Sequence, residues 1–332
     1  MASPAGPVAP PAPLADGLER VQGALLDAVA ADDPFLTEVA GHLIRAGGKR
    51  QRPAFAMAAA LTATTQATAV SRESMLGGVS CELVHLGSLY HDDVMDEATT
   101  RHFVESVNAR WGNLQAILAG DYLLAKASEI AAGLGTEVAG LLAATIGRLC
   151  EGQVAELQDT FNPARTEERY VRSIAGKTAA LFSTSCRIGA IVGGLDRARI
   201  EALTGFGRSY GMAFQIVDDV LDVMATDDEL GKPSGHDMVE GTYTLPVLRV
   251  LSGPNATALK ELLGRPLADD ERLAARDLVR SDGEAVPTAI ADARRHADAA
   301  VAALGPVAAT EAGAWLAATT EGLLAKVAAH TG

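Results

Sequence analysis

Two short acidic segments contain the residues best suited to chemistry. Asp92-Asp93-Val94-Met95-Asp96 and Asp218-Asp219-Val220-Leu221-Asp222 share the form Asp-Asp-x-x-Asp. In a helix, the first and last aspartates of such a segment lie on one face, and the second lies about 100° further round. Mg²⁺ takes oxygen ligands and commonly links one or two carboxylates to substrate phosphates. The pattern therefore predicts a magnesium site with six candidate ligands: Asp92, Asp93, Asp96, Asp218, Asp219 and Asp222.

The surroundings of these segments are apolar, although carboxylates are costly to bury without partners. A solvated acidic face would explain one acidic turn, but it does not explain two matching ones that both follow apolar helical stretches. Helical spacing also places His85 and Ser88 on the stripe of the first segment and Gln215 on that of the second. If the two helices face each other, their carboxylates surround a cavity for Mg²⁺ and a diphosphate, and the apolar residues beneath receive a hydrocarbon tail.

Basic residues are scarce, so their placement is informative. The run from Gly47 to Pro53 puts Lys49 and Arg52 on a glycine turn at a helix start, where free N–H groups and the helix dipole favour an anion. Three further groups lie in or near breaks between helices, and each alone could equally be a solvated surface charge. Together with the acidic segments they indicate a clamp for a diphosphate. These further groups are Arg101, Lys177 with Thr178, and Lys232.

Composition narrows the function classes. The chain has 332 residues and a formal net charge of −14, which argues against a nucleic-acid surface and against a membrane bound through a polybasic patch. No apolar stretch approaches the roughly 20 residues that span a bilayer. The odd number of cysteines, Cys81, Cys150 and Cys186, indicates reduced core thiols in a cytoplasmic protein rather than a disulfide or metal framework.

The rest of the sequence must position these groups, and its periodicity is helical almost throughout. We expect a disordered Pro/Ala-rich tail over residues 1–16 and one large all-α domain over residues 17–332, essentially without strands. Glycine, proline and Asx residues separate the expected helices. These helices cover residues 18–31, 34–45, 52–65, 73–96, 113–132, 137–158, 167–172, 178–192 and 197–224, with several alanine-rich helices after Pro254.

The ordered motifs resemble those of the trans-isoprenyl diphosphate synthases, the polyprenyl synthetase family. The likeness runs from about Gly47 to Pro246 and includes GGKRQRP, ELVHLGSLYHDDVMDEATTR, AGDYLLA, CEGQ, GKTAALF, FQIVDDVLD and GKPSGHDMVEGTYTLP. The resemblance implies a helical bundle of the isoprenoid synthase type with a central apolar cavity, usually a homodimer. It also implies an elongating prenyltransferase that condenses isopentenyl diphosphate with dimethylallyl, geranyl or farnesyl diphosphate, using Mg²⁺, three ions with bound diphosphate.

The resemblance also assigns roles to individual residues. Isopentenyl diphosphate would be held by Lys49, Arg52 and His85, with Arg101 and His102 nearby. The departing diphosphate would contact Lys177 and Lys232, while Gln215 and Thr178 would line the site of the allylic cation. The implied catalytic set is Asp92, Asp96, Lys177, Gln215 and Asp218, with Asp222 in support.

The sequence departs from the family pattern after the first acidic segment. A second arginine normally follows Arg101, but here the residue is His102, and the usual Gly-x-Pro turn is absent. Histidine is mostly neutral near pH 7 and lacks the guanidinium fork, so we expect weaker binding of isopentenyl diphosphate. Two alternatives follow: a terpene synthase-like enzyme that ionises an allylic diphosphate without condensation, and a non-catalytic subunit of a synthase.

Product length depends on residues just before Asp92. In this family bulky aromatic residues there close the pocket at farnesyl length, whereas here the residues are Gly87 and Ser88. Their small size predicts geranylgeranyl diphosphate or a longer product. Tyr122 could restore a floor elsewhere in the pocket.

Overall fold

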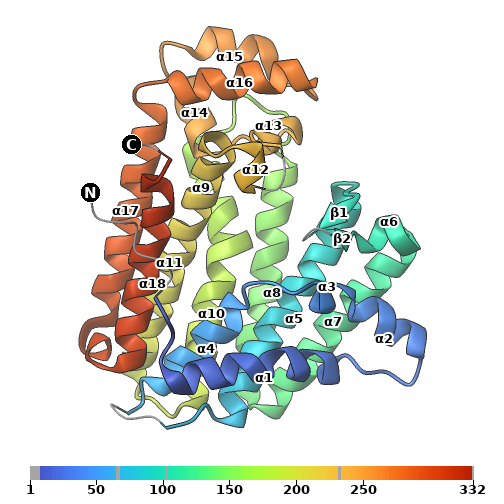
Figure 1. Ribbon diagram of the computed structural model, residues 1–332, viewed down its shortest axis with the longest axis vertical. Helices are drawn as coiled ribbons and strands as arrows, with labels where there is room; N and C mark the ends of the chain where they lie inside the picture. Colours follow the sequence, from blue (N-terminus) through green and yellow to red (C-terminus); the bar gives the residue numbers. More distant parts are fainter. Residues whose placement is uncertain (1–7, 65–67, 102–103, 231–232, 331–332) are drawn as a thin grey trace.

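The computed structural model describes residues 8–64, 68–101, 104–230 and 233–330 and consists almost entirely of helices (Figure 1). The first half of the chain forms α1 (Ala12–Ala28), α2 (Pro34–Ala40), α3 (His42–Ala46), α4 (Gln51–Leu61), α5 (Arg72–Met95), α6 (Val107–Trp111), α7 (Asn113–Gly133) and α8 (Thr136–Leu157). A two-stranded antiparallel hairpin, β1 (Thr100–Arg101) and β2 (Val104–Glu105), lies between α5 and α6.

The second half continues the bundle. It forms α9 (Glu167–Ile174), the π-helical turn η1 (Ala175–Ala179), α10 (Ala180–Val192), α11 (Arg197–Met224), α12 (Asp227–Leu230), α13 (His236–Val239), α14 (Leu245–Ser252), α15 (Ala256–Leu262), α16 (Asp269–Ser281), α17 (Ala285–Leu304), the 3₁₀ turn η2 (Gly305–Ala309) and α18 (Glu311–Ala328). The all-α fold class predicted from periodicity is confirmed.

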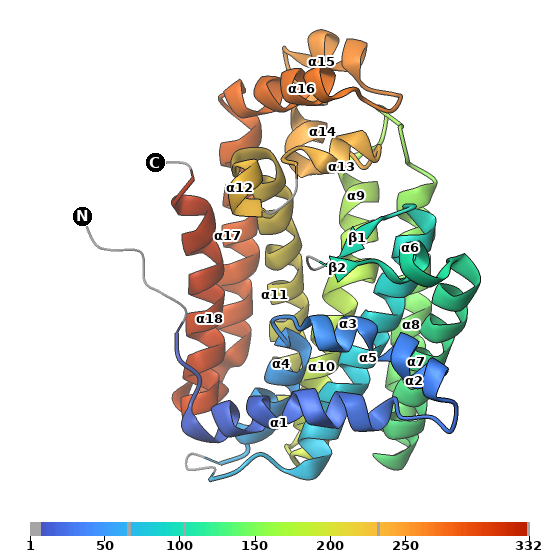
Figure 2. The same cartoon turned by 45° about the vertical axis from the view of Figure 1, so that its right-hand side comes forward.

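The long helices stand side by side around one apolar core, to which α1 at one end and α18 at the side both contribute (Figure 2). Helix α5 packs on α7 and α4, while α11 packs on α10 and α17. Glycines permit the closest contacts: a Cβ on Gly189 of α10 would lie only 1.9 Å from the Ala56 carbonyl of α4. A Cβ on Gly207 of α11 would likewise lie 2.6 Å from the Phe182 carbonyl of α10, so these glycines set the spacing of α10 from both α4 and α11.

Local signals start the helices that carry the acidic segments. The Ser71 hydroxyl accepts a hydrogen bond from the Ser74 N–H at the start of α5, and the Asp196 carboxylate accepts one from the Arg199 N–H at the start of α11. Capping of this kind satisfies N–H groups that have no partner within the helix. Each acidic segment lies near the opposite, C-terminal end of its helix.

Several expected boundaries are wrong. Helix α1 begins at Ala12, because proline is tolerated in a first helical turn, so residues 12–16 are helical rather than part of the tail. The helix expected over residues 34–45 divides at Gly41. Cys81 and Cys186 are buried as expected, whereas Cys150 is exposed.

Within the described ranges no helix combines the length and apolar character needed to cross a bilayer.

Candidate active site

The first acidic segment occupies the end of α5 and the residue after it. Asp92 is half-buried and Asp96 is exposed, whereas Asp93 is fully buried. The Asp93 Oδ1 lies 2.5 Å from the Arg101 Nε on β1. Helical geometry thus divides the segment: Asp92 and Asp96 share one face, and Asp93 turns aside and binds the hairpin. Burial raises the pKa of Asp93, and the Arg101 guanidinium opposes that shift.

The second acidic segment lies near the end of α11. Asp218 is exposed, while Asp219 is buried and accepts hydrogen bonds from the Tyr170 hydroxyl at 2.5 Å and the Gln215 side-chain N–H at 2.8 Å. The Gln215 carbonyl oxygen in turn accepts a hydrogen bond from the Thr178 hydroxyl at 2.7 Å. This chain of contacts joins α9, η1 and α11 and fixes the orientation of the second segment.

Asp222 closes the second segment and contacts the connection that follows it. Its backbone carbonyl accepts a hydrogen bond from the Gly235 N–H at 2.7 Å. Its carboxylate Oδ2 accepts one from the Asp237 N–H at 3.4 Å. The position of Asp222 is therefore tied to the loop between α12 and α13.

Lys177 and Glu156 lie between the two acidic segments. The Lys177 Nζ is 2.6 Å from the Glu156 Oε1. Burial alone would lower the pKa of Lys177, but the Glu156 and Asp92 carboxylates outweigh it and raise that pKa. Desolvation raises the pKa of Asp92, and Glu156 adds to the raised pKa of both Asp92 and Asp219. Glu156 is thus close enough to act on both segments, which places them around one site.

The π-helical turn η1 brings Lys177 to this position. Gly176 and Gly152 let η1 and α8 touch: a Cβ on Gly152 would lie 2.5 Å from the Lys177 backbone nitrogen. The sequence predicts that Gly176 interrupts a helix. In the structure, α9, η1 and α10 instead follow one another without a gap. Widened π turns within helices frequently occur at functional sites, since they shift the register of one residue.

Negative charge accumulates at the site. Partial desolvation and the neighbouring Glu240 and Asp92 carboxylates raise the pKa of Asp96 to about 6. Burial raises the pKa of Asp219 to about 7, although its hydrogen bonds from Tyr170 and Gln215 oppose the shift. Crowded carboxylates of this kind are hard oxygen donors that a bound divalent cation would stabilise in their charged form.

The basic turn predicted at the start of α4 has an unusual backbone. Gly47 and Gly48 have φ angles of 94° and 140°, and Arg50 has a φ of 47°. The Arg50 guanidinium donates hydrogen bonds to the Glu82 carboxylate at 3.0 Å, to the Gln22 side chain and to the Ile44 carbonyl. Arg50 therefore holds the turn to α1 and α5.

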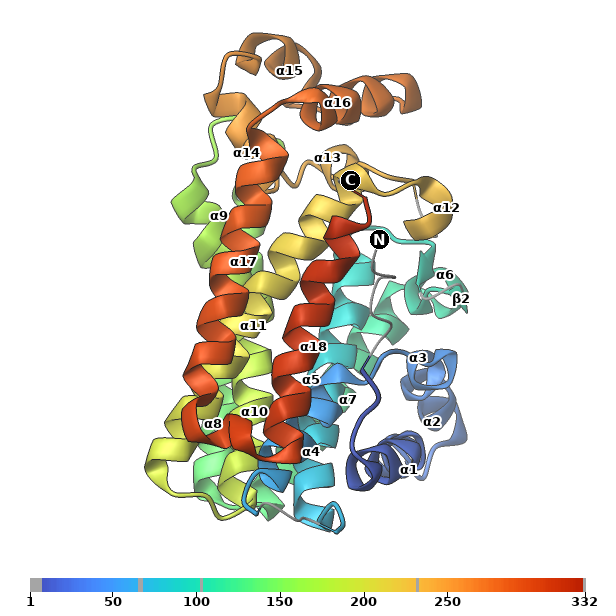
Figure 3. The ribbon, with the colours of Figure 1, turned by 60° about the vertical axis from the view of Figure 1, so that its left-hand side comes forward.

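The other cations of this turn remain available to an anion. Lys49 is exposed, and the Arg52 guanidinium lies 4.9 Å from the centroid of the Phe182 ring. The Arg52 Nε is buried without a hydrogen-bond partner among the described residues. Helix α18 ends beside α12, where His330, just after the helix, pairs with Glu229 (Figure 3). Its residue Lys326 is close enough to the start of α4 to be affected by Lys49. Desolvation and the Lys49 charge lower the pKa of Lys326 on α18, while Asp218 opposes the shift.

Comparisons with known proteins identify the chain. Residues 33–277 match the sequence profile of the family described as Polyprenyl synthetase. The chain belongs to the polyprenyl synthetase family. A nonaprenyl diphosphate synthase of Mycobacterium tuberculosis is 40% identical over 257 residues, 76% of each chain. Prenyl diphosphate synthases of this family transfer prenyl groups, so the chain is a prenyltransferase.

Solved structures of the family have the same fold. A heptaprenyl diphosphate synthase from Staphylococcus aureus matches with a TM-score of 0.87 at 29% identity, over 96% of this chain and 99% of that one. A geranylgeranyl pyrophosphate synthase from Corynebacterium glutamicum, complexed with calcium and isoprenyl diphosphate, matches with a TM-score of 0.80 at 35% identity. That match covers 95% of this chain and 96% of the other.

The residues expected to set product length in this polyprenyl synthetase lie in different environments. A Cβ on Gly87 would lie 3.1 Å from the Gly120 carbonyl, so Gly87 allows α5 to pack closely on α7. Ser88 is half-buried on α5 and donates its hydroxyl to the His85 carbonyl at 2.8 Å. Tyr122 donates a hydrogen bond to the Ala30 carbonyl, beyond the end of α1. Of the three, Ser88 lies nearest the stripe of Asp92.

Two expected residues are not described by the structure, and four site residues were not predicted. His102 and Lys232 fall outside the described residues, and His85 is half-buried on α5. Sequence reasoning missed four site residues: Glu156, Tyr170, Glu240 and Lys326. Glu156 lies just past the CEGQ motif, one helical turn after Gly152, which was a usable signal. Tyr170 and Lys326 carried no such signal, because the Tyr170–Asp219 hydrogen bond and the effect of the Asp218 charge on the pKa of Lys326 both join distant parts of the sequence.

Proposed function

We propose that the protein elongates prenyl chains by condensing isopentenyl diphosphate with an allylic diphosphate in a Mg²⁺-dependent reaction. The observation that carries this proposal is the Lys177–Glu156 pair, which lies between the α5 and α11 acidic segments. The C–O bond of the allylic diphosphate breaks to leave an allylic cation and diphosphate. The double bond of isopentenyl diphosphate then forms a new C–C bond to the allylic cation, which leaves a second cation. That cation passes a proton to the released diphosphate, and a double bond is restored.

The donor set suits Mg²⁺. Among the described residues no three His, Cys, Asp or Glu side chains gather closely enough to hold a metal ion. Mg²⁺ usually keeps several waters and binds one or two carboxylates together with substrate phosphates, so a preformed cluster of protein ligands is not needed for it. We assign metal binding to Asp92, Asp96, Asp218 and Asp222, with Asp93 and Asp219 as supports held by their own partners, and we propose three ions with bound diphosphate.

The chemistry of the ion and that of the protein residues are complementary. When bound, Mg²⁺ supplies positive charge that stabilises the diphosphate leaving group. Lys177, whose raised pKa keeps it protonated, offers its ammonium to the departing diphosphate beside Asp92. The Gln215 amide and the Thr178 hydroxyl, which are hydrogen-bonded to each other, line the site of the allylic cation. Lys49 and Arg52, at the start of α4, bind isopentenyl diphosphate.

For the product we propose geranylgeranyl diphosphate. The half-buried Ser88 supports an open pocket past farnesyl length. The relatives named as nonaprenyl and heptaprenyl diphosphate synthases favour a longer product as the second candidate.

We further propose a homodimer formed through α7 and α8. Leu114, Ile117 and Leu118 follow helical spacing on α7 and are 66%, 41% and 57% exposed. Val154 and Leu157 on the adjoining α8 are 52% and 46% exposed. An apolar face of this kind marks an interaction surface, and a second copy of the chain presents the matching face. Light scattering should give a dimer, and Leu118→Glu should give a monomer; a wild-type monomer would contradict the proposal.

The product assay tests the function. Purified protein with Mg²⁺ and dimethylallyl, geranyl or farnesyl diphosphate should yield longer diphosphates only when isopentenyl diphosphate is present, as identified by mass spectrometry. Hydrocarbons or alcohols formed from the allylic substrate alone would instead establish a terpene synthase-like enzyme. No turnover, with altered activity of an added synthase, would establish a subunit role.

The metal assignment has its own variant. Asp92→Asn should abolish turnover, because the first segment then loses a charged ligand. Asp298→Asn, an exposed aspartate of α17, is the matched control and should retain wild-type activity. Full activity of Asp92→Asn would refute the metal assignment.

A further inference from the structure

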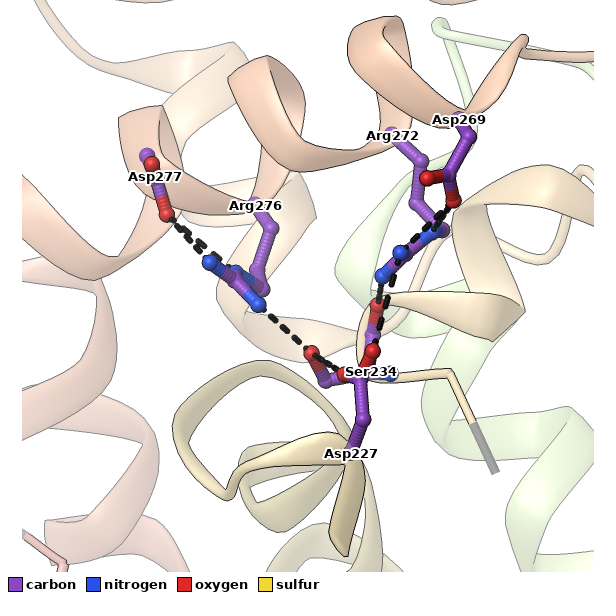
Figure 4. Close-up of polar contacts among 6 residues, drawn as sticks. All are labelled: Asp227, Ser234, Asp269, Arg272, Arg276 and Asp277. Atoms are coloured by element: carbon purple, nitrogen blue, oxygen red, sulfur yellow. Dashed lines mark hydrogen bonds and ion pairs between the residues drawn. The ribbon is translucent and has the colours of Figure 1, made fainter.

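A group of four polar residues anchors the connection that follows the second acidic segment. Asp227 and Ser234 belong to this connection, and Arg272 and Arg276 lie on α16 (Figure 4). We call these four residues the Ser234 cluster. Ser234 is completely buried and Arg272 is 5% exposed, whereas the Asp227 side chain is 51% exposed. The cluster therefore joins a buried serine to an aspartate at the surface.

Ser234 is bound on every polar atom. Its N–H and its hydroxyl both donate to the Asp227 Oδ1, at 2.8 and 2.7 Å. The Arg276 guanidinium donates to the Ser234 hydroxyl oxygen at 2.7 Å, and the Arg272 guanidinium donates to the Ser234 carbonyl. Bonds that involve a charged donor or acceptor are about twice as strong as neutral ones.

Backbone contacts lead from Ser234 directly to Asp222. The next residue, Gly235, adopts a φ of 73° and donates its N–H to the Asp222 carbonyl. Asp237 then donates its N–H to the Asp222 carboxylate Oδ2. A shift of Ser234 would move both donors, and so would reorient the carboxylate that ends the second acidic segment.

Helix α16 contacts this loop through side-chain packing as well. A Cβ on Gly235 would lie 3.4 Å from the Arg276 Cβ, and Met238 is buried beneath the same segment. Arg272 is itself held at 2.7 Å by Asp269, one turn earlier on α16. The Arg276 guanidinium is held at 2.9 Å by Asp277, the next residue of α16. Both guanidinium groups are therefore fixed to α16 before they reach the loop, as a positioning device requires.

We propose that Arg272 and Arg276 are positioning residues, which act through Ser234 to hold Asp222 in the orientation that binds metal and diphosphate. The proposal rests on the proposed function, since it gives Asp222 a role in that site. Partners that orient a metal ligand without touching the metal typically change affinity or activity by 10- to 100-fold when removed. The α16 helix, remote from the acidic segments in the sequence, thereby becomes part of the catalytic apparatus.

Binding of Mg²⁺ with inorganic diphosphate, measured by isothermal titration calorimetry on the full chain, tests the proposal without turnover. Arg276→Ala and Ser234→Ala should each weaken this binding by about tenfold. Arg276→Lys should recover most of the loss, because an ammonium can still donate one hydrogen bond to the Ser234 hydroxyl. Arg280→Ala removes an exposed arginine one turn further along α16 and should bind as the wild type does.

Three further readouts separate positioning from general stability. The unfolding midpoint of Arg276→Ala should stay close to that of the wild type, while kcat falls and the KM for the allylic diphosphate rises. Binding by Arg276→Ala within twofold of the wild type would overturn the proposal, as would a weakening by Arg280→Ala equal to that by Arg276→Ala. If the wild-type protein itself binds no Mg²⁺ with diphosphate, the proposed function fails instead.

Discussion

The buried ion pair between Arg50 and Glu82 offers the sharpest test of how the basic turn is held. The Arg50 and Glu82 side chains are 10% and 4% exposed, and their nearest charged atoms are 3.0 Å apart. At an effective dielectric constant near 20, Coulomb's law gives about 5.5 kcal/mol for this separation. Removing one member of a buried pair commonly costs about 3–5 kcal/mol, because the other charge stays buried without compensation. We expect Arg50→Met to lower the free energy of unfolding by about 3–5 kcal/mol.

A double-mutant cycle isolates the pair. Urea unfolding followed by circular dichroism should give Arg50→Met and Glu82→Leu large losses that do not add in the double variant, with a coupling of about 2 kcal/mol. Arg197→Met is the control, because its ion pair with Glu137 is exposed and should leave the unfolding midpoint unchanged. A loss below about 1 kcal/mol for Arg50→Met, or an additive cycle, would refute the assignment of a desolvated pair.

The same variant has a kinetic consequence. Arg50 also fixes the backbone of the turn through the Ile44 carbonyl, and the turn presents Lys49 and Arg52. At a temperature where Arg50→Met is folded, the KM for isopentenyl diphosphate should therefore rise while that for the allylic diphosphate stays constant. Equal changes in both KM values would show that the turn does not serve isopentenyl diphosphate specifically.

Three further predictions concern product length, the altered basic position and the thiols. Ser88→Phe should shorten the main product, as measured by mass spectrometry, and an unchanged product length would contradict a pocket beside Ser88. Gly87→Phe should instead lower the thermal unfolding midpoint, because even a Cβ on Gly87 would lie 3.1 Å from the Gly120 carbonyl. His102→Arg should lower the KM for isopentenyl diphosphate, and an unaltered value would show that the substitution there is neutral. Maleimide should label the folded protein at the exposed Cys150, because burial raises the pKa of Cys81 to about 11 and also covers Cys186; labelling of all three before unfolding would be inconsistent with the packing.

Local properties of the chain made the fold class and the main site residues predictable. Helical periodicity depends on neighbours three and four residues apart, so the long helices could be recognised without knowledge of their partners. The same spacing put Asp92 and Asp96 on one face of α5. The strand pair β1–β2 was less predictable, because Arg101 on β1 is held by Asp93 at the end of α5.

The sequence by itself determined that the protein is helical, that it carries two acidic segments and that a few cations accompany them. Only the tertiary structure decided what each residue does. Asp93 binds Arg101, Asp219 binds Tyr170, and Arg50 binds Glu82. Spacing along one helix sets the direction of a side chain, but its partner and its desolvation depend on which distant helix packs against it. For the same reason, the support that α16 gives to the second acidic segment is visible only in the folded chain.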